Sequence, residues 1–420
     1  MWEGHIFLKI FIIIVLASFL GFGLYYDLPT KVQEYYLNSL NDDQVTMDLD
    51  ECVQLKLKKK EDYKVSSDNK KVAKIDQDLK ISPVKAGETD VHVKTKRQDM
   101  VCHIIVANHY LNAPVIYLEP HQGYRLKQAG KSMYTSDNGA IEVNNGVVTC
   151  TRAANGTITT RTKNKTYTNK IVCRDVMSLM HSSSVTVYDA TSKKFLYTKN
   201  SDVKMNPASI TKILSVYTYL QKIHNVNAPT TLTAEDITTA SAGGAVTTKI
   251  NPNERVTYND LLHGALLVSG ADAIQSLCRT TYGSVGNLAA NMNANAAKFG
   301  MTNSHFTNGI GMTDPNHYTT GKDLVKLMSH VLQSKAFKKV FYTKKYKTSN
   351  GLHVFRSPSS SYGKKVLGAK NGLTNAAQEC VALEEKVNGH DLYVITMHAA
   401  TSHERKMDIV TMNQYLSFKL

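Results

Sequence analysis

The pattern of hydrophobic and polar positions changes twice along this chain of 420 residues. Residues 6–26 are almost wholly apolar, with a single charge at Lys9. Short segments that alternate between apolar and polar residues follow, as is typical of half-buried β-strands. From about residue 183 onward, segments with helical spacing stand between strand-like segments. The pattern therefore predicts an apolar N-terminal segment, an all-β region and a mixed α/β region.

The apolar segment is long enough to cross a membrane, since about 20 apolar residues span a bilayer. Lys9 precedes its most apolar part, which favours export of the chain that follows. We expect residues 1–28 to be either a cleaved signal peptide or a membrane anchor, and residues 29–45 to be a polar spacer. The rest of the chain is then expected outside the cytoplasm, either held at the membrane through this helix or secreted.

The all-β region contains one pattern twice. Ser67-Asp68-Asn69 recurs as Ser136-Asp137-Asn138, and Asn145-Gly146 marks a tight turn between strand-like segments. We predict two small sandwiches, at 46–110 and 111–176. Their order of motifs resembles the bacterial Ig-like group 2 domain, a common spacer in bacterial surface proteins.

The six cysteines include no C-x-x-C pair, which disfavours a zinc site or a thioredoxin-like motif. An exported chain could pair Cys52 with Cys102 and Cys150 with Cys173. Free buried thiols are the alternative, and the spacing does not decide between the two.

The mixed region, 177–420, is predicted to be one α/β domain. Strands are expected at 185–189, 195–197, 366–372, 380–385 and 392–398. Helices are expected at 258–268, 288–299, 320–332 and 404–418, the first with a cap at Thr257 and Asp260. Strands at both ends with helices between them predict a central antiparallel sheet covered by helices on both faces.

One helical segment in this region carries candidate chemistry. Pro207 suits the first position of a helix, so Ser209 should lie in its first turn, with Lys212 three residues on along the same face. A hydroxyl beside a neutral amine is the minimal arrangement for an activated serine. Spacing alone favours a helix-cap serine and a solvated lysine, because Ser67 and Lys70 have the same spacing in a polar segment.

Two later segments add to this candidate site. Ser269-Gly270-Ala271-Asp272 places a serine at a break between helical segments. Lys370-Asn371-Gly372 places a lysine on a strand, where a glycine lets a ligand approach the backbone closely.

In this order the three segments resemble the penicillin-binding protein and serine β-lactamase superfamily, whose members carry S-x-x-K, S-x-N and K-[ST]-G. Residues 207–212 match P-A-S-x-T-K, the lead-in of the D-alanyl-D-alanine carboxypeptidases. Residues 306–324 match their block F-x-N-x-x-G-x-x-D-P-N-H-Y-[ST]-T-x-x-D-L. The resemblance runs from about Ser183 to Leu420 and implies the α/β fold of that superfamily.

The resemblance implies a role for each residue of the site. Ser209 would be the acylating nucleophile, Lys212 its general base and Ser269 the proton relay to the leaving group. Burial and the charge of Lys370 would both lower the pKa of Lys212. The residues expected to bind substrate are Lys370, Asn371, Gly372 and Thr374, with the second oxyanion donor near Thr374.

Two positions depart from the family pattern. Ala271 stands where the family has asparagine, and Asp272 or a water molecule is the available substitute. Asn371 stands where the family has serine or threonine, and its amide can also donate a hydrogen bond to a carboxylate.

The implied function is removal of the terminal D-alanine from peptidoglycan stem peptides in a bacterial cell wall, with β-lactams as inhibitors. The alternative is a catalytically weak or inactive homologue that binds the wall. A β-lactamase is a weaker third hypothesis, because no Glu-x-x-x-Asn deacylation loop is recognisable in the sequence.

Charge and histidine spacing limit the partners. A net charge of +15 suits nucleic acid, anionic wall polymers or lipid. No nucleic-acid signature with interleaved aromatics is present, and export makes nucleic acid an unsuitable partner. The histidines show no ligand spacing, so no metal or other cofactor is expected. His317, in the 306–324 block, is expected to be structural.

Overall fold

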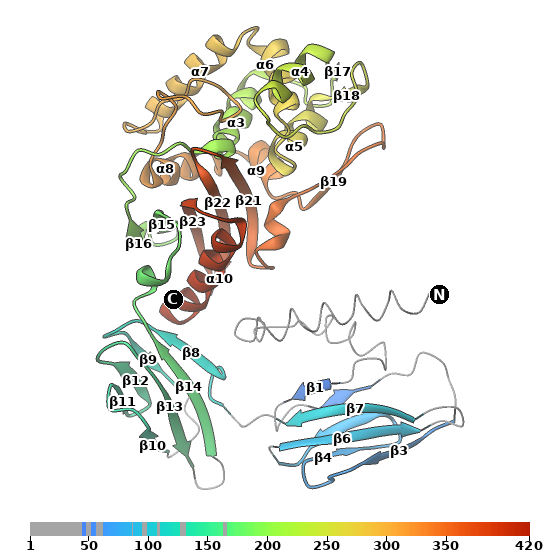
Figure 1. Cartoon of the computed structure of the whole chain (residues 1–420), viewed down its shortest axis with the longest axis vertical. Coiled ribbons are helices and arrows are strands. Elements are labelled where there is room, and N and C mark those ends of the chain that lie inside the picture. Colours follow the sequence, from blue (N-terminus) through green and yellow to red (C-terminus); the bar gives the residue numbers. More distant parts are fainter. Residues whose placement is uncertain are drawn as a thin grey trace. The chain divides into compact units, whose positions relative to one another are not determined.

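The computed structural model describes residues 44–47, 52–55, 62–85, 87–94, 99–106, 110–126, 132–162 and 166–420. The apolar segment 6–26 and nearly all of the predicted spacer lie outside these residues, so the leader or anchor stays a prediction. In the part of the chain that is described, no helix is long and apolar enough to cross a membrane. Contacts divide the chain into two units, Met1–Arg174 and Asp175–Leu420, which are described separately here (Figure 1).

The first unit contains two sets of strands with the same connectivity. Within the described ranges, the first set has a four-stranded sheet β1-β7-β6-β3 and a three-stranded sheet β2-β5-β4. The second set repeats this order as β8-β14-β13-β10 and β9-β12-β11. In both sets the first strand pairs in parallel with the last, β1 with β7 and β8 with β14. The repeated motifs in the sequence thus correspond to a repeated topology.

The strands of the first set are β1 Gln44–Met47, β2 Val53–Gln54, β3 Lys64–Ser67, β4 Ala73–Ile75, β5 Lys80–Pro83, β6 Gly87–Lys94 and β7 Asp99–Val106. Those of the second set are β8 Val115–Leu118, β9 Gly123–Arg125, β10 Met133–Ser136, β11 Ile141–Asn144, β12 Val147–Cys150, β13 Ala154–Arg161 and β14 Thr166–Cys173.

Local chemistry explains these strands. In β6, Val91 and Val93 are fully buried while the residues between and beside them are not, because side chains alternate between the faces of a strand. The predicted turn between β11 and β12 is confirmed, with positive φ angles of 48° at Asn145 and 76° at Gly146. Cys52, Cys150, Cys173, Cys278 and Cys380 are not in disulfides, and the thiols of Cys150 and Cys173 influence each other's pKa.

The second unit is built on the predicted antiparallel sheet. Its five strands lie in the order β16-β15-β23-β22-β21, so the first strands of the unit meet the last. Their bounds are β15 Ser184–Asp189, β16 Lys194–Lys199, β21 Val366–Thr374, β22 Gln378–Val387 and β23 His390–Ala399. Strand β21 forms one edge of the sheet, which leaves its outer side available to the elements around it.

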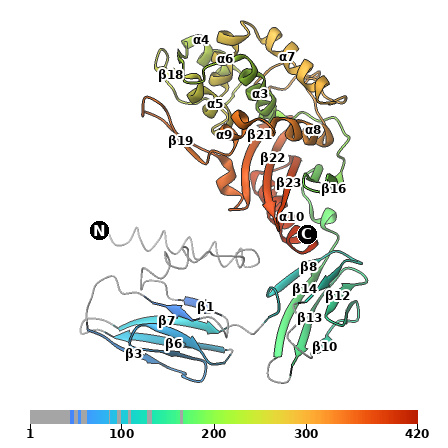
Figure 2. The same cartoon turned by 180° about the vertical axis from the view of Figure 1, so that it is seen from behind.

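Helices cover both faces of this sheet, as predicted. The helices are α3 Lys212–Lys222, α4 Ala234–Ala242, α5 Tyr258–Leu267, α6 Ala271–Thr281, α7 Val285–Lys298, α8 Gly321–Val331, α9 Lys335–Phe341 and α10 Ser402–Lys419. Tyr393, Ile395 and Met397 of β23 join the large apolar cluster that contains α3, α5 and α8. The alternate residues of β23 face the other way, where α10 packs against β22 and β23. Figure 2 shows α3, α5, α6 and α7 gathered beyond one end of the sheet.

Several elements were not predicted. These are α4, α9 and two short antiparallel strand pairs, β17 Pro229–Thr231 with β18 Arg255–Thr257, and β19 Lys345–Lys347 with β20 Val354–Arg356. The cap of α5 was predicted and is confirmed, because Thr257 and Asp260 form a capping box.

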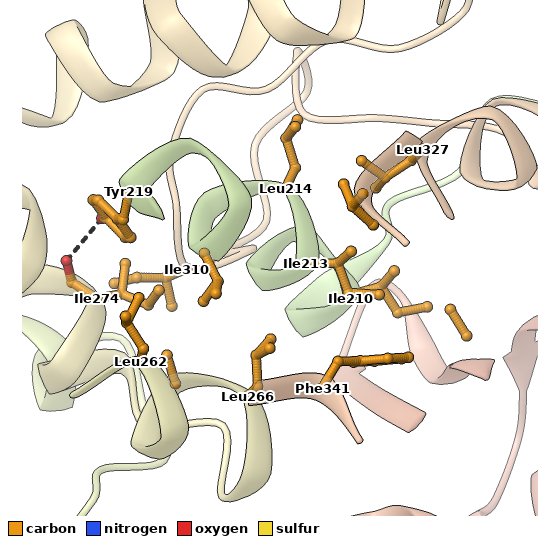
Figure 3. Close-up of a cluster of buried hydrophobic side chains, with 14 of the residues drawn as sticks. Ile210, Ile213, Leu214, Tyr219, Leu262, Leu266, Ile274, Ile310, Leu327 and Phe341 are labelled. Atoms are coloured by element: carbon orange, nitrogen blue, oxygen red, sulfur yellow. Dashed lines mark hydrogen bonds between the residues drawn. The ribbon is translucent and has the colours of Figure 1, made fainter. Parts of the chain in front are cut away.

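Helix α3 is the centre of the apolar cluster. Figure 3 shows Ile213 and Leu214 of α3 among apolar side chains from α5, α6, α8 and α9. Tyr219, also on α3, is fully buried and donates its hydroxyl to the carbonyl oxygen of Ile274 at 2.9 Å. This packing fixes the position of the helix, and therefore of Lys212 at its first residue.

Candidate active site

Ser209 lies in a 3-10 helix, η2 Ala208–Thr211, and not in the first turn of an α-helix as predicted; α3 begins only at Lys212. Ala208 has a φ of 47°, in the left-handed region that costs an L-residue roughly 1–2 kcal/mol. That conformation is incompatible with an α-helix, so the chain enters through a tight turn. The Ala208 N–H donates to Asn206 Oδ1 at 2.9 Å, which stabilises the turn.

Lys212 contacts the Ser209 hydroxyl directly. Its Nζ lies 2.7 Å from Ser209 Oγ and donates to the carbonyl oxygen of Ile310 at 2.8 Å. The side chain is only 1% exposed. Burial lowers the pKa of Lys212 to about 7, although the negative charge of Asp272 opposes this shift. A large fraction of the amine is therefore neutral near pH 7, with a lone pair that can accept the hydroxyl proton.

Two glycines allow other segments to approach the backbone of the turn that leads into Ser209. A Cβ atom at Gly311, which has a φ of +90°, would lie 1.9 Å from the carbonyl oxygen of Ala208. A Cβ atom at Gly372 on β21 would lie 2.8 Å from the carbonyl oxygen of Pro207 and 3.1 Å from the Ser209 nitrogen. Close approach at Gly372 was predicted for a ligand. The structure shows it for the protein's own backbone, which holds Ser209 against the edge strand.

Lys370 and Ser269, which the sequence analysis placed in one candidate site, are in contact in the structure. Lys370 Nζ donates to Ser269 Oγ at 2.9 Å and to the carbonyl oxygen of Asn371 at 2.7 Å. Ser269 lies at the break between α5 and α6, with a φ of 63°. Such strained backbone is often found at functional sites.

The two buried lysines repel each other. Burial lowers the pKa of Lys370 well below its usual value, and the positive charges of Lys212 and Arg405 lower it further. We predicted that Lys370 would lower the pKa of Lys212. Burial is the leading cause of the lowered pKa of Lys212. The repulsion between the two lysines is mutual, so it disfavours a positive charge on both amines at once.

His317 has both ring nitrogens engaged away from Ser209. Its Nε2 lies 2.8 Å from Thr211 Oγ1, and its Nδ1 accepts from the Thr307 N–H at 3.1 Å. Burial lowers the pKa of His317 to about 4, so the ring is neutral at pH 7. It ties the 306–317 loop to the turn that carries Ser209, which agrees with a structural role. In the described part of the chain, no group of three or more His, Cys, Asp or Glu side chains could hold a metal ion.

A family model described as D-alanyl-D-alanine carboxypeptidase, peptidase S11, matches residues 171–401, which is more than half of the chain. The chain belongs to this family. The relatives include the D-alanyl-D-alanine carboxypeptidases DacF of Bacillus subtilis, 25% identical over 224 residues, and DacA of Haemophilus influenzae, 28% identical over 228 residues. Each match covers 52% of this chain and 58% of the relative, so the chain spans little more than half the length of these proteins.

Solved structures support the same fold for this peptidase S11 domain. The crystal structure of the Streptomyces K15 DD-transpeptidase matches with a TM-score of 0.53 at 25% sequence identity. The match covers 57% of this chain and 98% of that one.

The first departure from the family motifs has a structural consequence. Ala271 is the buried first residue of α6. The neighbouring Asp272 does not substitute for the missing asparagine amide. Its carboxylate accepts from the Thr248 N–H at 2.9 and 3.0 Å and from Thr248 Oγ1 at 2.7 Å. Asp272 therefore secures the segment around Thr248 and supplies a negative charge near Lys212.

The second departure, Asn371, has a partner that sequence reasoning missed. Asn371 Oδ1 accepts from the hydroxyl of Tyr362 at 2.9 Å. Thr374, at the end of β21, accepts from the Ala377 N–H at 3.0 Å, and its Oγ1 lies 3.3 Å from that of Thr313.

Arg405 on α10 was also missed, although its charge acts on Lys370. Neither Tyr362 nor Arg405 lies in one of the motifs, so no local pattern could have identified them.

Proposed function

We propose that this chain is an extracytoplasmic serine D-Ala-D-Ala carboxypeptidase, which removes the terminal D-alanine from peptidoglycan stem peptides through an acyl-enzyme on Ser209. The observation that carries this proposal is the 2.7 Å contact between Ser209 Oγ and the buried amine of Lys212, whose pKa is about 7. Membership of the family supports the substrate class.

In the first step, Ser209 Oγ attacks the carbonyl carbon of the peptide bond between the two D-alanines. Neutral Lys212 accepts the hydroxyl proton as the bond forms. The negative charge on the carbonyl oxygen is stabilised by the backbone N–H of Ser209 and by one from β21, near Thr374. Ser209 suits this role because the first N–H groups of a helix have no acceptor within it.

The leaving D-alanine nitrogen then takes up the proton that Lys212 accepted, which returns Lys212 to its neutral form. Ser269 is the proposed relay, since its hydroxyl is within hydrogen-bond reach of Lys370. The C–N bond breaks, D-alanine leaves with that proton, and Ser209 carries the acyl group as an ester. A water molecule, deprotonated by the same base, hydrolyses the ester and restores the hydroxyl.

The terminal carboxylate of the substrate is the second recognition element. We propose that Lys370 attracts it and that the Asn371 amide and Thr374 help to bind it. Gly372 keeps the strand close to Ser209. A β-lactam presents a strained amide beside a carboxylate, so it is expected to acylate Ser209 and inhibit the enzyme.

For the N-terminal part we propose two Ig-like repeats that act as a spacer. The repeated topology of the first unit supports this proposal. The apolar segment 6–26 would be the leader or membrane anchor, and the protein would act at the membrane or in the wall of a bacterium.

A labelled penicillin tests the enzymatic proposal. We expect it to label the wild type covalently and to label Ser209→Ala not at all. Ser67→Ala is the matched control, because Ser67 precedes Lys70 with the same spacing but lies in the first unit. Release of D-alanine from a peptide ending in D-Ala-D-Ala measures turnover.

Ala271 favours one other function, a wall-binding homologue without turnover, because it removes an amide that the family motif supplies beside the lysine. If the labelled penicillin does not react with the wild type, and the wild type still binds peptidoglycan, the wall-binding function is supported. Labelling together with D-alanine release would exclude it.

A further inference from the structure

Four side chains form a continuous polar network beside the candidate site. Glu379 on β22 pairs with the guanidinium of Arg405 on α10, and both side chains are largely buried. The positive charge of the guanidinium acts on the hydroxyl of Tyr362, which follows the 3-10 helix η3 Pro358–Ser361. The Tyr362 hydroxyl lies 2.9 Å from Asn371 Oδ1 on the edge strand. Asn371 is the last member of the network and is partly exposed.

The direction of the hydrogen bonds in this network is determined by its arginine. A guanidinium is a cation that can only donate, so its charge favours the lone pairs of the Tyr362 oxygen on the side of Arg405. The hydroxyl proton of Tyr362 is then directed to its hydrogen-bond partner, the side chain of Asn371. A donated proton requires an acceptor, so Asn371 presents its carbonyl oxygen to Tyr362 and its NH2 group away from it.

This orientation matters for an anion. An asparagine side chain can turn over and present either its oxygen or its nitrogen with little change in shape. The oxygen would repel a carboxylate, whereas the NH2 group offers two donors. A serine or threonine hydroxyl at the same position needs no such control, because it rotates to suit its partner.

We propose that Tyr362, held by Arg405 and Glu379, is a positioning residue that keeps the NH2 group of Asn371 directed at the C-terminal carboxylate of the substrate. This inference rests on the proposed function and explains how an asparagine replaces the hydroxyl residue of the family motif. Tyr362 itself does not touch the substrate. It acts through Asn371, and its effect is therefore on recognition of the carboxylate and not on the chemical step.

The test compares Tyr362→Phe with the wild type on diacetyl-L-lysyl-D-alanyl-D-alanine and on the same peptide with a C-terminal amide. The variant removes one hydrogen bond, so the KM for the carboxylate peptide should rise about three- to tenfold with kcat nearly unchanged. The KM for the neutral peptide should change much less, so selectivity for the carboxylate falls.

A double variant separates positioning from a general loss of structure. In Asn371→Thr the hydroxyl rotates freely, so adding Tyr362→Phe should leave KM unchanged. Tyr342→Phe is the matched control, because Tyr342 is another hydrogen-bonded tyrosine of this unit, paired with Glu384 outside the network. Should Tyr362→Phe fail to fold, Glu379→Gln loosens Arg405 without altering Asn371, and it should raise the KM for the carboxylate peptide by a smaller factor.

The outcomes distinguish this inference from the proposed function. Absence of acylation in the wild type would contradict the function itself. An active wild type whose KM for both peptides is unaffected by Tyr362→Phe would overturn the positioning role alone. An equal effect of Tyr362→Phe in the Asn371→Thr background would also overturn it, because the effect would then not pass through Asn371.

Discussion

The two ends of the candidate site are built in different ways. At the nucleophile end, Ser209 and Lys212 lie three residues apart, and the carbonyl oxygen of Ile310 that contacts the lysine belongs to the long block matched in the sequence. At the carboxylate end, Asn371 departs from the family motif. Its partner Tyr362, and Arg405, whose charge acts on Tyr362, come from outside all three motifs.

The difference shows which part of such a site can vary. The proton transfer needs one hydroxyl and one buried amine at contact distance, and a short local spacing provides both. Recognition of a carboxylate needs only hydrogen-bond donors and a positive charge close to the bound carboxylate. Side chains from several elements can supply these in different combinations. A change at one position is then compensated by others. The predictions below test this contrast, beginning at the nucleophile end.

The largest effect is expected for Lys212→Ala, which removes the proposed base while leaving the hydroxyl in place. General-base catalysis contributes about 10²–10⁴-fold, so the rate of acylation by a labelled penicillin should fall by that amount. Lys70→Ala, in the similarly spaced segment of the first unit, is the control and should have no effect. Acylation of Lys212→Ala at the wild-type rate would show that the base is misassigned.

Gly372→Ala should have the next largest effect. The new Cβ atom would lie 2.8 Å from the carbonyl oxygen of Pro207, so the turn that carries Ser209 must shift. A displacement of 1 Å at a reacting group can cost about 10²-fold, and we expect a loss of that order in acylation. Gly286→Ala is the control, because a Cβ atom there meets nothing within 4 Å. Normal acylation by Gly372→Ala would mean that the close approach is not required.

The acylation rate should also depend on pH. Because the pKa of Lys212 is about 7, the amine is mostly protonated at pH 6 and mostly neutral at pH 8. Only the neutral form accepts a proton, so the rate should rise about tenfold over this interval and level off above it. The rate of covalent labelling by a labelled penicillin, measured in quenched time courses at several pH values, gives this pH dependence. A rate that falls as pH rises through 7 would contradict the neutral-amine mechanism.

The smallest effect is expected for Asn371→Thr, at the carboxylate end. A threonine hydroxyl can donate to the carboxylate as the asparagine amide does, so acylation should be preserved or raised, within about threefold. Second-order acylation constants for the two proteins provide the comparison. If Asn371→Thr lowers the acylation constant as much as Lys212→Ala does, the two ends of the site do not differ in their tolerance of substitutions.

Much of the second unit could be predicted from local pattern. The strands near its end and the helix with the Thr257 cap were located correctly, because side-chain periodicity and capping chemistry are properties of a few consecutive residues. The 3-10 turn at Ser209 was not, since the left-handed φ of Ala208 occurs where Gly311 and Gly372 from distant segments come close to its backbone. The role of Asp272 was likewise undetermined until Thr248 was seen beside it.

By itself the sequence determined the kinds of elements and the pairing of Ser209, the proposed nucleophile, with Lys212, since an interval of three residues keeps two side chains on one face. Tertiary structure alone decided how deeply the two lysines are buried, which backbone segments approach Ser209, and which partner the side chain of Asn371 has. Those properties depend on burial and on partners from η3, β22 and α10, and neither is encoded in the residues that surround each group along the chain.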